Sequence, residues 1–169
     1  LAAFPVNLLF PVAAIFIAAS FWEFAIAFTQ NRALSKKGHR ALWGTALVMS
    51  ILILVPSFLT KEVVYHPWGK SVILGLPEYI LFFVYFMFFF FGGLIIVGKR
   101  LTHAVGHERL QLWYIFWSVL IAGTGGVIFN LFMPSPFFNE WRYIWTGPIF
   151  TFLIVLFITY AIAKHQLLN

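Results

Sequence analysis

Five long apolar stretches constrain what this chain can fold into more than any other feature. Each has about 18 residues or more, which is the length that a helix needs to cross the hydrocarbon core of a bilayer. No stretch alternates apolar and polar residues with period two, so a membrane β-barrel is excluded. The predicted spans are residues 7–30, 41–59, 78–97, 110–134 and 141–164.

Composition supports the same class. Only 9% of the 169 residues are charged and 62% are hydrophobic, whereas a soluble domain carries about a quarter charged residues. No linker and no internal repeat divides the chain. We therefore expect an all-α integral membrane protein, a bundle of five transmembrane helices in a single domain over residues 1–169.

The basic residues predict an orientation, because cytoplasmic loops carry an excess of lysine and arginine. Eight of the eleven lie in the first and third connections and at the C-terminal end: Arg32, Lys36, Lys37, Arg40, Lys99, Arg100, Arg109 and Lys164. The other three, Lys61, Lys70 and Arg142, lie in the second and fourth connections. We expect an outer N-terminus and a cytoplasmic C-terminus in a multi-pass protein of the cell (inner or plasma) membrane. This bias explains the net charge of +6 without a nucleic-acid partner.

The two predicted outer connections are rich in aromatic residues: Tyr65, Trp68, Phe137, Phe138, Trp141 and Trp145. Aromatic rings at this depth are typical of the belt at a membrane–water interface. A lid over an outward-facing pocket is the alternative interpretation.

The residues that most enzymes or cofactor proteins need are missing. The chain has no cysteine and no aspartate, and none of its five histidines falls in the middle of a span. We expect no catalytic constellation, no ATP site and no cofactor. His103 and His107 form a weak zinc candidate of the H-x-x-x-H type. Ala104 stands where a metalloprotease glutamate would be and Gly106 weakens a helix here, so a basic turn is the favoured interpretation.

Two polar residues stand out inside the spans. Glu23 lies seven residues before the polar Gln30, about 10 Å into the membrane at ~1.5 Å per residue. A carboxylate there needs a partner, such as Arg32, Lys36 or Lys99. Two interpretations stay open, a polar lock between helices that a signal shifts and a glutamate paired to a loop cation.

Asn130 is the other intramembrane polar residue and follows the run Gly123-Thr124-Gly125-Gly126. Small residues allow close helix approach, and a buried amide can bridge helices. Packing is therefore the favoured role of Asn130, and a ligand contact is the alternative.

The last span carries Pro148 and leaves the membrane through Tyr160, Lys164 and His165. The proline is either a helix-start residue or a hinge. The helix is the candidate signal-transmitting element, because it ends on the predicted cytoplasmic side.

The order of motifs over residues 108–169 resembles the N-terminal seven-helix membrane region of bacterial sensor histidine kinases. The motifs are Glu108-Arg109-Leu110-Gln111-Leu112, Asn130 with Pro134, Gly147-Pro148, and the ending Tyr160-Ala161-Ile162-Ala163-Lys164-His165-Gln166-Leu167-Leu168-Asn169. The resemblance is weak before residue 108, although Phe24-Ala25-Ile26-Ala27-Phe28-Thr29 is similar to the inner end of the third helix of the family.

This resemblance implies that the five spans match helices three to seven of the family. The chain would then be a fragment that lacks two N-terminal helices, in agreement with its start at Leu1 rather than methionine. The parent protein would be a histidine kinase and would work as a homodimer. No phosphoacceptor histidine or ATP-binding segment follows within these residues, since His165 belongs to the helix exit.

The expected function is therefore sensory. The chain would respond to a small apolar or amphipathic ligand, or to the lipid bilayer, and pass the stimulus along the last helix to a cytoplasmic output domain of a two-component system. The alternatives are a structural subunit of a larger membrane complex and a small transporter or channel component. A transport path requires polar residues at mid-membrane, and few are present.

Overall fold

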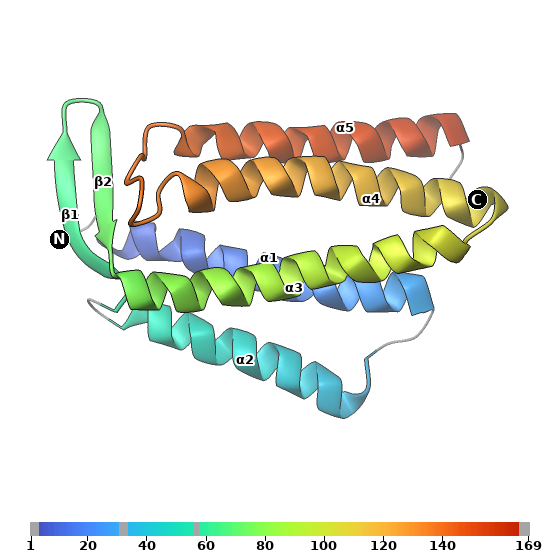
Figure 1. Ribbon diagram of the computed structural model, residues 1–169, viewed down its shortest axis with the longest axis horizontal. Coiled ribbons are helices and arrows are strands. Elements are labelled where there is room, and N and C mark those ends of the chain that lie inside the picture. The colour runs from blue at the N-terminus through green and yellow to red at the C-terminus, as the bar shows by residue number, and fades with distance from the viewer. Residues whose placement is uncertain (1–3, 31–33, 56–57, 166–169) are drawn as a thin grey trace. The chain divides into compact units, whose positions relative to one another are not determined.

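The computed structural model describes residues 4–30, 34–55 and 58–165, and it is mostly helical. The helices are α1 (Phe4–Gln30), α2 (Lys36–Leu54), α3 (Leu76–His103), α4 (Gly106–Gly126) and α5 (Gly147–His165), as labelled in Figure 1. A π-helical segment, Val127–Phe132, continues α4, and a 3-10 turn, Ile144–Thr146, precedes α5.

Among the described residues, three helices are long and apolar enough to cross a membrane. They are α1 over Leu9–Thr29, α3 over Leu76–His103, and α4 with its π-helical continuation over Gly106–Phe132. The three correspond to the first, third and fourth predicted spans. This finding is compatible with a membrane protein, and the complete five-span bundle stays a prediction.

The second predicted span, residues 41–59, is wrong at its C-terminal end. Helix α2 ends at Leu54, and Val55 has an extended ψ of 125°. The reason lies in the sequence, because Pro56 disfavours helical backbone at the residue before it. At its other end α2 starts earlier than predicted, and three of its first five residues are basic.

The connection between α2 and α3 is a β-hairpin, which the all-α prediction did not include. Strands β1 (Thr60–His66) and β2 (Gly69–Leu74) pair in a two-stranded sheet. Val63 and Val64 favour extended backbone, and Pro67 and Trp68 form the turn. Gly69 follows with a φ of 147°, a value that residues with a side chain rarely adopt.

The described chain divides into two compact units. Unit 1 comprises Leu1–Val64 and Val72–Ile96, and unit 2 comprises Tyr65–Ser71 and Val97–Asn169. The core of unit 1 repeats every three or four residues, the spacing of one helix face. Its buried residues include Ile15, Ala18, Ala25, Leu42, Ala46, Met49, Ile53, Phe82, Phe86 and Phe90.

In unit 2, α4 and α5 pack against each other. Residues of α4 that are buried there include Leu112, Ser118, Ala122 and Gly125. Phe150 of α5 stacks on Phe129 of the π-helical segment, with 5.6 Å between ring centroids. The helix pair is therefore held by small residues and by rings.

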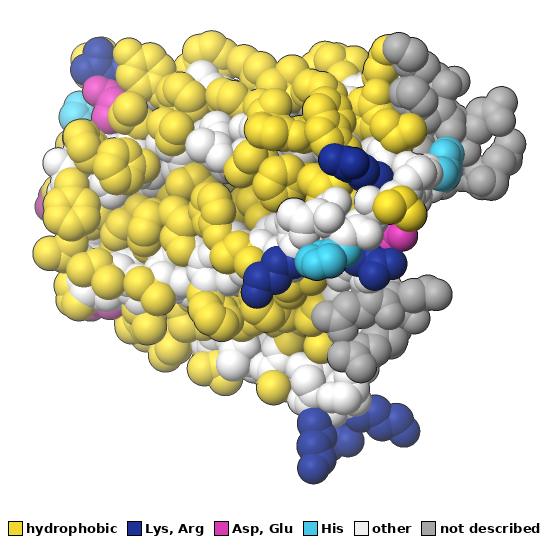
Figure 2. Space-filling view, turned by 45° about the vertical axis from the view of Figure 1, so that its right-hand side comes forward, with side chains coloured by type: hydrophobic (Ala, Val, Ile, Leu, Met, Phe, Trp, Pro, Cys, Tyr) yellow, Lys and Arg dark blue, Asp and Glu magenta, His cyan; other side chains and the backbone are white. Residues whose placement is uncertain are grey.

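Large apolar side chains are also exposed. Phe10, Val84 and Phe88 each expose more than half of their surface. Figure 2 shows hydrophobic side chains covering most of the face in view, with lysines and arginines at one upper corner, within the right-hand half and at the bottom. Apolar surface of this extent marks contact with lipid or with another protein.

Candidate functional site

The candidate site in unit 1 is centred on Glu23. This residue lies on α1, whereas His39 and Trp43 lie on α2 and are four residues apart, so they share one helix face. Oε1 of Glu23 is 2.8 Å from Nδ1 of His39, and Nε1 of Trp43 donates a hydrogen bond of 2.9 Å to Oε2. Both carboxylate oxygens are therefore engaged, and we call the three residues the Glu23 clamp.

The clamp differs from the prediction in its partners. Instead of Lys36 or Lys99, the Glu23 partners within the described part of the chain are an imidazole and an indole. Arg32, the third expected partner, lies outside the described residues. Because α2 begins at Lys36, the contact comes from the end of its first turn, at His39, and from the next turn, at Trp43. A polar and an indole side chain four residues apart, just after the connection, were the signal that sequence reasoning missed.

Aromatic packing on α3 fixes the α1 segment that carries the clamp. Gly92 and Gly93 leave room for the Trp22 and Phe21 rings, and a Cβ at Gly92 would collide with the Trp22 indole. Phe21 also packs on Phe90, with 5.3 Å between ring centroids. The residues on either side of Glu23 in unit 1 are therefore held by close helix contact.

Asn130 lies in the π-helical segment and is directed to the start of α5. A Cβ at Gly147 would collide with the Asn130 amide. Phe150 lies one turn further along α5, and a Cβ at Gly125 of α4 would collide with its ring. The Asn130 amide therefore lies against the start of α5, while the residue as a whole is exposed, and its packing and ligand-contact roles both stay predictions.

The predicted signal-transmitting residues lie along α5. Pro148 is the second residue of the helix, where a proline breaks no internal hydrogen bond, so its position favours the helix-start interpretation over a hinge. Tyr160 is half exposed, and its ring lies 6.3 Å from that of Tyr114 on α4. The backbone of α5 continues through Lys164 to His165, whose side chains lie outside the described part. Residues 166–169 are also outside it.

The two histidines of the H-x-x-x-H pair do not share one helix face. His103 is the last residue of α3, and His107 is the second residue of α4. Gly106, with a φ of 59°, separates the two helices. His103 instead lies near its own helix end, with Nδ1 2.9 Å from the carbonyl oxygen of Lys99. Within the described residues there is no group of three or more metal-binding side chains.

Two predicted outer connections meet within unit 2. The Arg142 guanidinium lies over the Trp68 ring at 5.8 Å, and His66 stacks on the same tryptophan at 4.8 Å. Cation–π contacts of this kind are weak when exposed, about 0.5–1 kcal/mol. The contact places the hairpin turn next to the connection before α5, the arrangement expected when both lie on one side of the membrane. The lid interpretation stays a prediction.

Comparisons with protein-family models, with curated proteins and with solved structures give no match. Function is therefore inferred from the residues and from their geometry.

Proposed function

We propose that the chain is the membrane sensory region of a two-component sensor histidine kinase. In this role it has no catalytic groups of its own and passes a stimulus through α5 to a cytoplasmic output domain. The proposal draws on the motif order over residues 108–169 and on the way in which α4 and α5 pack.

The observation that carries the proposal is the attachment of α5 to α4 near both of its ends. Phe150, in the first turn of α5, packs on Gly125 and Phe129. Tyr160, near the other end, packs on Tyr114. A continuous helix that packs on its neighbour near both ends stays straight, so a shift at its start moves the whole helix as one rigid element. The helix then continues to His165, toward the end where the resemblance expects the output domain.

The π-helical segment is the part of α4 suited to a change of state. Short π-helical turns within α-helices are frequent at functional sites, and the change of state in this proposal is an exchange of this turn for α-helix. Such an exchange changes the direction of Asn130, which contacts Gly147 at the start of α5. A stimulus must favour one packing over the other by about 1–3 kcal/mol to give a useful response.

The finer topology belongs to the same proposal. The chain crosses the inner membrane five times, its N-terminus is outside and its C-terminus is cytoplasmic. The parent kinase is a homodimer, and the stimulus is a small apolar or amphipathic molecule. The sorting of basic residues between connections and the largely apolar surface support these statements.

An insertion series tests the proposal. A dimeric kinase core is fused after Asn169, and one to four residues are inserted after Lys164. Because a helix advances about 100° per residue, autophosphorylation should vary periodically with insertion length, with a partial return at three or four residues. Equal autophosphorylation across the series would contradict transmission through the helix. A parent reading frame without a phosphoacceptor histidine and ATP-binding domain would remove the kinase assignment itself.

A further inference from the structure

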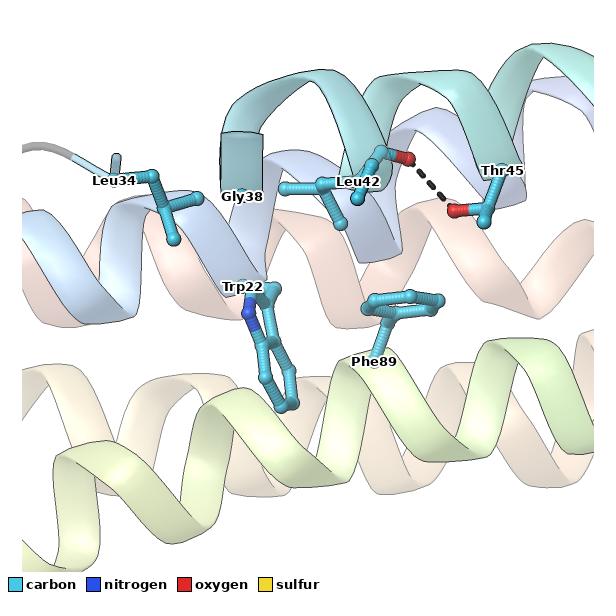
Figure 3. A pocket seen from close by; sticks show the side chains of 7 residues that line it. Trp22, Leu34, Gly38, Leu42, Thr45 and Phe89 are labelled. Atoms are coloured by element: carbon cyan, nitrogen blue, oxygen red, sulfur yellow. Dashed lines mark hydrogen bonds between the residues drawn. The ribbon is translucent and has the colours of Figure 1, made fainter. Parts of the chain in front are cut away.

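Two features of the described residues are separate from the packing of α4 on α5. One is an apolar groove of about 240 Å³ in unit 1, which Figure 3 shows between Trp22, Thr45 and Phe89. The Thr45 hydroxyl donates to the carbonyl oxygen of Leu42 and no described lining residue is charged, so the groove points to no particular ligand. The other feature is the hairpin tip of unit 2, Tyr65–Ser71, which contacts the connection that leads into α5.

The hairpin tip holds the Trp68 indole in a set orientation. Nε2 of His66 lies 2.8 Å from the Ser71 hydroxyl oxygen, a contact that spans the turn, and Ser71 is buried. The His66 ring stacks on the Trp68 indole, with 4.8 Å between ring centroids and 7° between the ring planes. Trp68 itself is about half exposed. The turn therefore presents an oriented indole to its surroundings.

Arg142 joins the hairpin tip to the connection before α5. Its guanidinium carbon lies 5.8 Å from the centroid of the Trp68 ring. Its Nε and its backbone N–H both donate to Oε1 of Glu140, at 3.1 and 3.2 Å. Because the side chain is tied to its own backbone as well as to the tip, a movement of Trp68 displaces the backbone at Arg142.

The residue that follows Arg142 lies where the proposed change of state takes place. Tyr143 packs edge to face on Phe129 of the π-helical segment, with 6.5 Å between ring centroids. The carbonyl oxygen of Tyr143 accepts from the backbone N–H and the hydroxyl of Thr146, at 3.0 and 2.7 Å. The backbone next to Arg142 therefore touches both the π-helical segment and the 3-10 turn that precedes α5.

We propose that the hairpin tip is a strap that sets the position of the connection before α5 and so acts as an outer input to this helix. The contact between Trp68 and Arg142 is the coupling point. The role as an input rests on the proposed function, whereas the positioning of the connection is a property of this chain alone. An exposed cation–π contact is weak, so a stimulus of small free energy is enough to release it.

Hydrogen–deuterium exchange of the full chain in detergent micelles, read by mass spectrometry, tests the positioning. Trp68→Leu should speed the exchange of the amides in Ile144–Thr146 by about two- to fivefold, the factor that one exposed cation–π contact contributes. Tyr65→Leu is the matched control, because it removes an exposed ring of the same tip that lies under Lys70 instead of Arg142. It should leave these amides unchanged.

Further variants keep the test decisive if Trp68→Leu does not fold, as judged by far-UV circular dichroism. Arg142→Gln removes the cation and should speed exchange at the same amides at least as much, since its bond to Glu140 is weakened as well. Trp68→Tyr keeps a ring at the guanidinium and should retain most of the wild-type protection. The double variant W68L/R142Q should exchange less than about twofold faster than R142Q, because the contact is already lost.

Two exchange results would overturn the strap. Equal exchange of the turn amides in Trp68→Leu and Tyr65→Leu would show that the tip does not position the connection. Faster exchange confined to Tyr65–Ser71 would limit the role of Trp68 to the hairpin itself.

The input role is tested separately in a chimera with a kinase core fused after Asn169. Trp68→Leu should shift basal autophosphorylation by at least about twofold, and Tyr65→Leu should not. Unchanged autophosphorylation of Trp68→Leu, in a chimera that responds to helix insertions, would overturn the input role. A parent reading frame without a kinase domain would instead remove the proposed function and leave the exchange prediction as it stands.

Discussion

The α1–α2 pair in unit 1 and the α4–α5 pair in unit 2 are held together by different physical means. The first pair is joined by directed polar contacts, in which one carboxylate accepts from an indole and meets an imidazole. The second pair is joined by fit, in which a glycine lies under a phenylalanine ring and an amide lies over a glycine. The first kind of contact is sensitive to protonation and polarity, whereas the second is sensitive to volume. A stimulus can therefore act on the two units by different routes.

The largest effect is expected from adding volume between α4 and α5. Gly125→Leu forces a side chain into the Phe150 ring, and overpacking of this kind costs about 1–3 kcal/mol. Gly126→Leu is the matched control, because a Cβ there meets nothing within 4 Å. The unfolding free energy of each variant is measured by titrating the protein in mixed micelles with sodium dodecyl sulfate. Equal stabilities of the two variants would contradict the packing described for unit 2.

Removal of the carboxylate from the clamp should come next. Glu23→Ala leaves the Trp43 indole without its acceptor, at an expected cost of about 1–2 kcal/mol. Glu62→Ala, at an exposed position on β1, should change the unfolding free energy by less than about 0.5 kcal/mol. A loss no greater than that of the control would show that the clamp does not hold α1 to α2.

A double-mutant cycle sharpens the account of the clamp. Trp43→Phe keeps the ring and removes only the Nε1–H donor, so it should cost about 0.5–1.5 kcal/mol. The double variant should lose much less unfolding free energy than the two single variants lose in sum, because both substitutions remove the same hydrogen bond. Full additivity in the unfolding free energy would mean that the two residues act independently.

The smallest effect is expected at the ion pair between α3 and α4. Arg100 and Glu108 are 2.6 Å apart, but both side chains are nearly half exposed. Exposed pairs contribute little, so Glu108→Gln should change stability by less than about 1 kcal/mol, and less still at high salt. A loss as large as that of Glu23→Ala would remove the distinction between the clamp and a surface pair.

The length of the apolar stretches made part of this fold predictable from the sequence. It located α1, α3 and α4, and all three are long and apolar enough to cross a membrane. Local backbone chemistry decided the rest. Pro56 ends α2 five residues before the predicted end, and the segment from Thr60 to Leu74 forms a hairpin too short to show a clear pattern.

The candidate site was predictable only in part, for a related reason. Glu23 stands out because a carboxylate in an apolar stretch needs a partner. Its actual partners depend on the rotation of α2, which the sequence does not reveal, so charged residues were expected where His39 and Trp43 lie. The neighbour of Asn130 was equally unpredictable, because the sequence does not reveal that Gly147 of α5 faces its amide.

The central claim is that the α4–α5 contact sets the state of α5. The most direct test measures autophosphorylation of the kinase chimera that carries Gly125→Leu or Gly126→Leu. Gly125→Leu should shift basal activity by at least about fivefold in either direction, which corresponds to ~1 kcal/mol of coupling. Gly126→Leu should leave it unchanged. Equal activity of the two variants, with both inserted and folded, would contradict the claim.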